Sequence, residues 1–202
     1  MTQDDEAVGR LRDAVGRLAE ETRGRTRTHR SHDDADDTLG TVATDDAIGF
    51  DPFPLLRALA RHGAEVVVMG QVAGILHGSR ELTGDLDLLW TGDAGQAAAL
   101  AAGFASVAAD LTDDDGRPVA CDPASFALPK VQFRTADASG DCCTPALPWG
   151  DLPIADFLAR RRTARADGFD VHYLDRADLI RMRRAVGRPK DLRRAAELDQ
   201  GV

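Results

Sequence analysis

The chain has few cysteines, few aromatic residues and no long apolar run. Three cysteines among 202 residues, two of them adjacent at Cys142 and Cys143, do not make a disulfide framework, so we expect a reduced, cytoplasmic protein. No stretch approaches the roughly 20 apolar residues of a transmembrane helix, and the first residues lack the basic and apolar regions of a secretory signal. These absences argue against a disulfide-stabilised secreted domain and against a membrane protein.

Aromatic residues make up only 5% of the chain, so we interpret Trp90 and Trp149 as packing anchors rather than as platforms for nucleic-acid bases. The formal net charge of −9 argues against a protein that coats DNA. The charge is uneven, because residues 156–202 carry 8 acidic and 12 basic side chains. A basic end on an acidic chain fits a metal-dependent phosphate site with a cationic wall, and fits equally an acidic domain with a solvated basic helix.

The first part of the chain divides into two segments that precede a folded domain. Residues 1–22 carry apolar side chains at three- and four-residue steps, which predicts an amphipathic helix. Residues 23–46 are almost devoid of apolar side chains, so we expect a flexible polar linker, in which His29 and His32 belong to a solvated tract rather than to a metal site. The domain itself is expected over residues 47–202.

Apolar periodicity and Gly or Pro breaks predict the elements of this domain. Residues 104–127 show no clear pattern, and residues 136–150 are expected to form a loop. The predicted helices cover residues 51–62, 71–77, 94–102, 154–165, 175–186 and 190–198, and the predicted strands cover residues 65–69, 85–90, 130–135 and 169–173. Strands separated by helices indicate an α+β (α/β-like) fold, with a small mixed β-sheet flanked by helices.

The chemistry is concentrated between residues 66 and 90. An apolar strand ends at Gly70, a short helix follows, and the next strand opens with Asp85-Leu86-Asp87. Residues two apart on a strand point to the same face, so Asp85 and Asp87 place two carboxylates side by side. Two such charges repel unless a cation neutralises them, and hard oxygen ligands of this kind suit Mg²⁺. Gly70 lets the backbone approach a phosphate closely.

These residues resemble the minimal nucleotidyltransferases of the DNA polymerase β-like superfamily, and more closely bacterial stand-alone domains related to abortive-infection toxin–antitoxin systems. The shared pattern is an apolar strand, a Gly-Gly or Gly-Ser turn, a short helix and Asp-x-Asp on the next strand. Here it reads MGQ at residues 69–71 and TGDLDLL at residues 83–89. A second match, DLIRMRRAVGRPKDL at residues 178–192, resembles a helical segment near the C-terminus of many such domains. The resemblance covers about residues 50–198.

The resemblance implies a role for each matched residue. Asp85 and Asp87 would be catalytic and would coordinate Mg²⁺, which bridges the phosphates of an NTP and activates an acceptor hydroxyl. Gly70 would hold the phosphates. Contacts with the nucleotide are also implied for a further set: Gln71, Ser79, Arg183, Lys190 and Asp191. The neighbouring Arg181, Arg184 and Arg188 would form a phosphate-facing wall or a solvated face. Alternatively, this basic run, with Lys190 and Asp191, would hold the terminal helices together.

Three positions depart from the family pattern. Gln71 stands where a second glycine or a serine is expected, which makes the phosphate cradle bulkier. Gln132 stands where we expect a third carboxylate, and an amide can coordinate a metal but cannot act as a base; Asp137 lies nearby, past the predicted strand. Arg183 replaces a lysine and keeps the charge but not the compact ammonium.

Two functions therefore remain open. The first is a Mg²⁺-dependent nucleotidyltransferase that moves an NMP from an NTP to a hydroxyl of RNA such as tRNA, of a protein or of a small molecule, with a cognate antitoxin as a partner. The second is a catalytically degenerate module of the same fold that acts in regulation. In that case residues 1–46 would be its arm for binding another protein.

Overall fold

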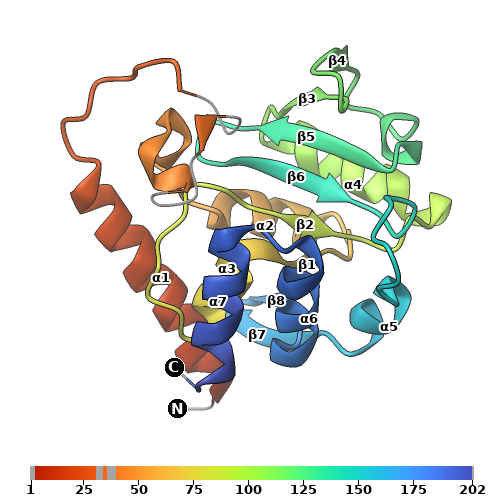
Figure 1. Ribbon diagram of the computed structural model, residues 1–202. Coiled ribbons are helices and arrows are strands. Elements are labelled where there is room, and N and C mark those ends of the chain that lie inside the picture. Colours follow the sequence, from red (N-terminus) through yellow and green to blue (C-terminus); the bar gives the residue numbers. More distant parts are fainter. Residues whose placement is uncertain (1–2, 31–33, 36–39, 202) are drawn as a thin grey trace.

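The structure is a computed structural model that describes residues 3–30, 34–35 and 40–201. It has an α+β architecture, in which eight strands of the described chain form one mixed sheet with the order β4-β3-β5-β6-β2-β1-β8-β7 (Figure 1). The strands are β1 (Val67–Val68), β2 (Leu88–Leu89), β3 (Asp110–Thr112), β4 (Pro118–Val119), β5 (Lys130–Arg134), β6 (Ser139–Cys143), β7 (Arg162–Ala166) and β8 (Phe169–Tyr173). The predicted fold class is confirmed.

The middle of the sheet is built from short, fully buried strands. β1 pairs with β2 in antiparallel and with β8 in parallel orientation, and β2 pairs with β6 in parallel orientation. Val67 and Val68 are buried, as expected for a β-branched run in a central strand. The backbone pairing extends past β2 towards its N-terminal side, because Met69 N donates to Asp87 O at 2.9 Å and Leu86 N donates to Ser139 O at 2.9 Å.

Helices cover the sheet and enclose the core. They are α1 (Gln3–Glu21), α2 (Phe53–Arg61), α3 (Gly70–Leu76), α4 (Ala94–Ser106), α5 (Ile154–Ala159), α6 (Arg176–Val186) and α7 (Pro189–Asp199). In Figure 1, α4 lies behind β5 and β6, while α7 lies in front beside α3. α2 packs on α4, and α6 packs on α7 and on α3. No helix among the described residues is long and apolar enough to cross a membrane.

The N-terminal region belongs to the domain more closely than the sequence predicted. The predicted helix is confirmed as α1, but its apolar stripe is buried against β7 and α3. The described part of the expected linker is held by hydrogen bonds: Arg25 donates to Val42 O and Thr44 O, and the Asp45 carboxylate accepts from the backbone N–H groups of Thr28 and His29. Polar contacts therefore hold these residues, and Val42 also packs against the core. His32 lies outside the described residues.

Two element predictions are wrong. Residues 139–143 were expected in a loop and form β6, which is inserted between β5 and β2. Gly140 allows this insertion, because a Cβ there would lie 2.0 Å from Leu86 O. Residues 162–165 were expected at the end of a helix and belong to β7. Asp167 and Gly168, both with positive φ, turn the chain from β7 into β8, which is the usual Asp-Gly signal of a tight hairpin.

The stretch without a clear sequence pattern, residues 104–127, is now assigned. It completes α4 and adds β3 and the edge strand β4, followed by a short 3-10 helix (Ser125–Ala127). β3 pairs with β5, so this stretch extends the sheet beyond the predicted strand at residues 130–135, which is confirmed as β5.

Candidate functional site

Asp85 and Asp87 lie immediately before β2, on extended backbone that continues the strand. Leu86 between them is fully buried, Asp85 is 8% exposed and Asp87 is partly exposed. Because side chains alternate along extended chain, the two carboxylates share the face opposite Leu86. This is the arrangement that the sequence predicted, although β2 itself is shorter than the predicted strand.

A third carboxylate reaches the same face from β6. β2 and β6 run parallel with Leu88 opposite Cys142, so Asp141 is level with Asp87 in the adjacent strand. The pKa of Asp85 is raised well above its usual value, first by burial and then by the charges of Asp87, Asp141 and Asp46. Sequence reasoning missed Asp141 because the Ser-Gly-Asp-Cys-Cys stretch reads as a loop. The sequence feature that could have indicated a strand here is the adjacent pair of cysteines, which are buried as small hydrophobic residues.

Asp46, from the polar N-terminal segment, is the fourth acid at this place. Its carboxylate Oδ1 accepts from Arg134 Nη1 at 2.6 Å. We call Asp46, Asp85, Asp87 and Asp141 the acid cluster. Three cationic side chains border it: Arg134 on Asp46, Lys130, whose Nζ is 3.8 Å from Asp141 Oδ2, and Lys190, whose charge lowers the pKa of Asp85 without offsetting burial and the like charges.

Gly70, the first residue of α3, is in direct contact with the acid cluster. Its φ is +61°, and a Cβ there would lie 1.9 Å from Asp87 Oδ2. Only glycine fits, because the backbone conformation and the available space both exclude a side chain. In the structure the backbone of Gly70 lies close to the Asp87 carboxylate, and its predicted approach to a phosphate stays a prediction.

Gln71 and Arg183, which the family resemblance places at the nucleotide, contact each other inside the protein. Arg183 Nη2 donates to Gln71 Oε1 at 2.7 Å and to Gly70 O at 3.0 Å, and Nη1 donates to Arg194 O at 3.1 Å. Burial and the charge of Arg194 lower the pKa of Arg183 to about 10. Gly74 leaves room for this guanidinium, since a Cβ there would lie 2.6 Å from Nη2.

The same contacts continue through Ser79 to the last helix. Gln71 Nε2 donates to Ser79 Oγ at 3.0 Å and to Glu81 O at 2.8 Å. Ser79 Oγ donates to Glu197 Oε2 at 3.0 Å, and Arg194 donates to Glu81 Oε1 at 2.6 Å. We call the whole set the arginine network: Gln71, Ser79, Glu81, Arg183, Arg194 and Glu197. It fastens α3 and the following loop to α6 and α7.

The two remaining residues of the C-terminal match differ from each other. Lys190, in the first turn of α7, is half-buried, and its positive charge acts to lower the pKa of Asp85. Asp191 is buried and forms an ion pair with Arg188. Arg181 and Arg184 also have acidic partners, Asp178 and Asp199, so the basic run is largely paired within the described chain.

Gln132, which stands where a third carboxylate was expected, and Asp137, considered as its substitute, both lie in the β5–β6 hairpin with Asp141. Gln132 is directly opposite Asp141 in the register and accepts a hydrogen bond from Thr112 Oγ1 at 3.3 Å. Asp137 is exposed in the turn, and its carbonyl accepts from Asp51 N at 2.7 Å. Cys142 and Cys143 are buried, and burial raises the pKa of both thiols, which favours the unreactive protonated form.

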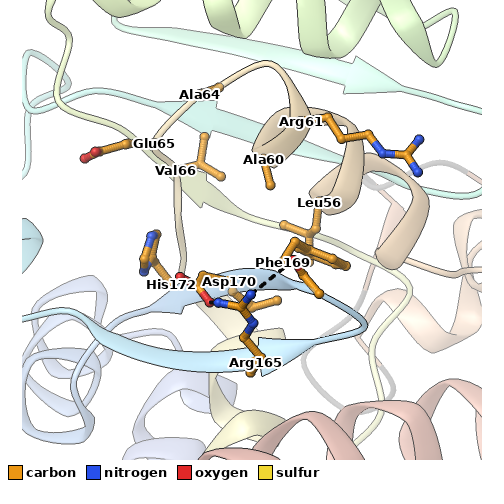
Figure 2. A pocket seen from close by; sticks show the side chains of 13 residues that line it. Leu56, Ala60, Arg61, Ala64, Glu65, Val66, Arg165, Phe169, Asp170 and His172 are labelled. Carbon is orange, nitrogen blue, oxygen red and sulfur yellow. Dashed lines mark hydrogen bonds and ion pairs between the residues drawn. The ribbon is translucent and has the colours of Figure 1, made fainter.

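Two cavities lie away from the acid cluster. One of about 410 Å³ is enclosed by α2 and the β7–β8 hairpin, where Leu56 faces Phe169, and Arg165 Nη1 donates to Asp170 Oδ1 at 2.9 Å (Figure 2). A groove of about 1190 Å³ runs between α1 and the loop after α3. Two of its guanidinium groups are held by backbone, since Arg10 donates to Leu76 O and Arg176 to His77 O.

The residues that the structure describes contain no group of three His, Cys, Asp or Glu side chains that could hold a metal ion as they stand. The donors of the acid cluster are nevertheless hard oxygens with a deficit of positive charge, which is the chemistry that Mg²⁺ prefers. No family model matches the chain, and no curated protein is significantly similar to it.

Proposed function

We propose that the protein is a Mg²⁺-dependent nucleotidyltransferase that transfers an NMP from an NTP to an acceptor hydroxyl. The observation that carries this proposal is the meeting of Asp85, Asp87 and Asp141 on one face of two adjacent strands. Three carboxylates placed together at a cost in electrostatic energy support a function that requires them. Asp141 supplies the third carboxylate of the family pattern, which Gln132 does not provide.

The donor set fits Mg²⁺ although, among the described residues, no three acidic side chains are placed to hold an ion as they stand. Mg²⁺ is usually held by one or two carboxylates and completes its shell with water and substrate phosphates, so a preformed protein cage is not expected. Asp85 and Asp87 would hold the ion through their carboxylate oxygens. When bound, the ion would neutralise phosphate charge and polarise the acceptor oxygen. The burial of Asp85 strengthens its electrostatic attraction for a cation.

Other side chains would orient the substrate. Asp141 adds a third negative charge beside Asp87, and it can accept a hydrogen bond from the acceptor hydroxyl. Lys190, whose charge acts on Asp85, and Lys130, which is near Asp141, can pair with phosphate oxygens. Gly70 keeps the start of α3 in contact with Asp87, so that this carboxylate would be held in place from the backbone side.

Label transfer tests the proposal. The full chain is incubated with Mg²⁺, each α-³²P-labelled NTP in turn, and total RNA, protein or a metabolite extract as acceptor. We expect one nucleotide to label one acceptor class. Asp85→Asn and Asp141→Asn should reduce the label by at least about a thousandfold, a typical loss when a charge-stabilising group is removed in phosphoryl transfer.

Asp137→Asn provides the matched control, because Asp137 is an exposed aspartate in the hairpin that also carries Asp141. It should label the acceptor as the natural chain does. If the natural chain labels no acceptor, or if Asp85→Asn labels as well as the natural chain, the proposed activity is wrong. If expression arrests growth and Asp85→Asn relieves the arrest, the activity is of the toxin type.

A non-catalytic module is the second candidate, and the arginine network favours it. Gln71, Ser79 and Arg183, which the resemblance assigns to the nucleotide, are engaged in internal hydrogen bonds. A chain that kept the fold and lost nucleotide binding would have this property. Thermal unfolding distinguishes the two, because a ligand at a hundred times its dissociation constant adds about 2.7 kcal/mol to the stability. A nucleotide-dependent rise in Tm that requires Mg²⁺ supports the enzyme, and its absence with every NTP supports the module.

A further inference from the structure

The N-terminal segment docks directly beside the Asp-x-Asp motif. The hydroxyl oxygens of Thr41 and Thr83 are 2.9 Å apart, and Gly84 N donates to Thr41 Oγ1 at 3.0 Å. The backbones then come into contact, because a Cβ at Gly84 would lie 2.5 Å from Ala47 Cα and 2.9 Å from the carbonyl carbon of Asp46. A segment that lacks an apolar stripe is therefore attached to the residue that precedes Asp85.

This docking buries Asp46 in an unsatisfied state. The side chain of Asp46 is only 2% exposed, and Oδ1 is bonded to Arg134. Within the part of the chain that the structure describes, Oδ2 is buried and has no hydrogen-bond partner. A buried carboxylate oxygen without a partner is costly and calls for an explanation. The charge of Asp46 also acts on Asp85, which places it in the acid cluster.

A buried ion pair by itself does not account for the unsatisfied oxygen. Asp178 on α6 is a close comparison, because its side chain is 4% exposed and its partner Arg160 is 49% exposed, against 52% for Arg134. Both oxygens of Asp178 are satisfied there, since Arg160 Nε donates to Oδ2 and Nη2 donates to Oδ1. Arg134 donates to one oxygen of Asp46, and the other is left for a different group.

We infer that Asp46 supports a divalent-cation site held by Asp85 and Asp87: its Oδ2 adds negative charge beside these ligands and can accept a hydrogen bond from water on the ion. The inference rests on the proposed function, because both involve the acid cluster. The proposed function, however, requires only Asp85, Asp87 and Asp141. Asp46 is thus a positioning residue, supplied by a segment more than thirty residues before the motif.

Mn²⁺ binding to the full chain tests the inference without any assay of activity. Free Mn²⁺ is counted by electron paramagnetic resonance for the natural chain and for Asp46→Asn, Arg134→Gln, Asp85→Asn and Asp178→Asn, each first shown to unfold cooperatively. We expect Asp46→Asn to weaken binding at least about tenfold, as is typical for groups that support metal ligands. Asp85→Asn should abolish binding, and Asp178→Asn should leave it unchanged.

Arg134→Gln separates a metal role from a structural one. Asp46→Asn and Arg134→Gln each break the same ion pair, so a purely structural role would weaken Mn²⁺ binding in both. In a cation site, loss of Arg134 removes a competing positive charge, and Mn²⁺ should bind as tightly as in the natural chain or more tightly.

The outcomes distinguish this inference from the proposed function. If Asp46→Asn binds within twofold of the natural chain while Asp85→Asn loses binding, Asp46 has no part in the site and the proposed function stands. If the natural chain binds no Mn²⁺, or all four variants bind alike, the inference is overturned together with the metal site. Weakened binding in Asp46→Asn with no label transfer would support the inference and count against the activity.

Discussion

The acid cluster and the arginine network are two buried charged regions that meet at the start of α3. Gly70 is in contact with the Asp87 carboxylate, whereas Gln71, the next residue, bonds to Arg183. In the network, acceptors surround each buried donor, and the acid cluster has like charges around Asp85 and an unsatisfied oxygen on Asp46. The difference separates two arrangements of buried charge: the paired network stabilises the fold, whereas the acid cluster concentrates like charge at a cost, which fits the cation binding proposed above.

Removing the centre of the arginine network should produce the largest loss of stability. Arg183→Ala leaves Gln71 Oε1 and two backbone carbonyls without their donor in a buried place. We expect the free energy of unfolding, measured in urea, to fall by about 3–5 kcal/mol. Gly74→Ala should lower the free energy of unfolding in the natural chain. In Arg183→Ala it should leave this free energy nearly unchanged, because the guanidinium that the new Cβ meets is gone. A loss below about 1 kcal/mol for Arg183→Ala would contradict the structural role of the network.

Gly70→Ala should have the next largest effect, because it disturbs the boundary between the two regions. The new Cβ meets Asp87 Oδ2 at 1.9 Å, in addition to the strain of a positive φ. We expect a loss of about 2–3 kcal/mol in urea unfolding. Gly63→Ala is the matched control, since Gly63 has a φ of +73° with no atom within 4 Å of its Cβ position, and it should lose only about 1 kcal/mol. Equal losses would mean that Asp87 moves away without cost.

The smallest effects should have opposite signs in the two regions. Without divalent cations at neutral pH, Asp85→Asn should raise the stability by about 1 kcal/mol, because it removes a buried charge beside other acids. Glu81→Gln should lower it by about 1–2 kcal/mol, because Arg194 and Arg193 lose their charged acceptor. Thermal unfolding of the two variants measures both signs, and a common sign would remove the distinction between the regions.

The stability of the Asp85→Asn variant should also depend on pH differently from that of the natural chain. The pKa of Asp85 is raised in the folded state, so its contribution to stability is fully present below the unfolded pKa and is lost as the pH rises through the folded pKa. Metal-free natural protein should therefore lose stability over that rise, while Asp85→Asn should not. Unfolding at a series of pH values in EDTA measures the difference, and parallel curves would contradict it.

The sequence predicted the elements whose apolar side chains recur regularly. α2, α3, α6 and α7 carry a helical stripe, and β1, β5 and β8 carry β-branched or alternating residues. β6 was missed because a strand of Ser, Gly, Asp and Cys has little β-propensity, and only its insertion between β5 and β2 stabilises it. β7 was missed because Arg-Thr-Ala-Arg-Ala continued a helical pattern up to an Asp-Gly turn.

The part of the candidate site that lies within one local sequence motif could be predicted. Asp85, Asp87 and Gly70 follow from the motif, and the structure brings them together. Asp141 and Asp46 could not be found, because Asp141 needed the position of β6 and Asp46 needed a docking contact between two glycine- and threonine-rich segments. The pairing of Gln71 with Arg183 joins residues from opposite ends of the domain, and no spacing in the sequence indicates it.

The pairing of β1 with β8 has a consequence for how the chain folds as it is synthesised. Val67 pairs with His172, so one edge of the central strand has no neighbour until most of the chain has left the ribosome. During that time the apolar run around β1 resembles an unprotected sheet edge, the kind of surface from which aggregation begins. Pairing of the β7–β8 hairpin with β1 thus completes the sheet. Ribosome-bound chains that stop before residue 169 should therefore recruit chaperones more strongly than chains that extend past α6.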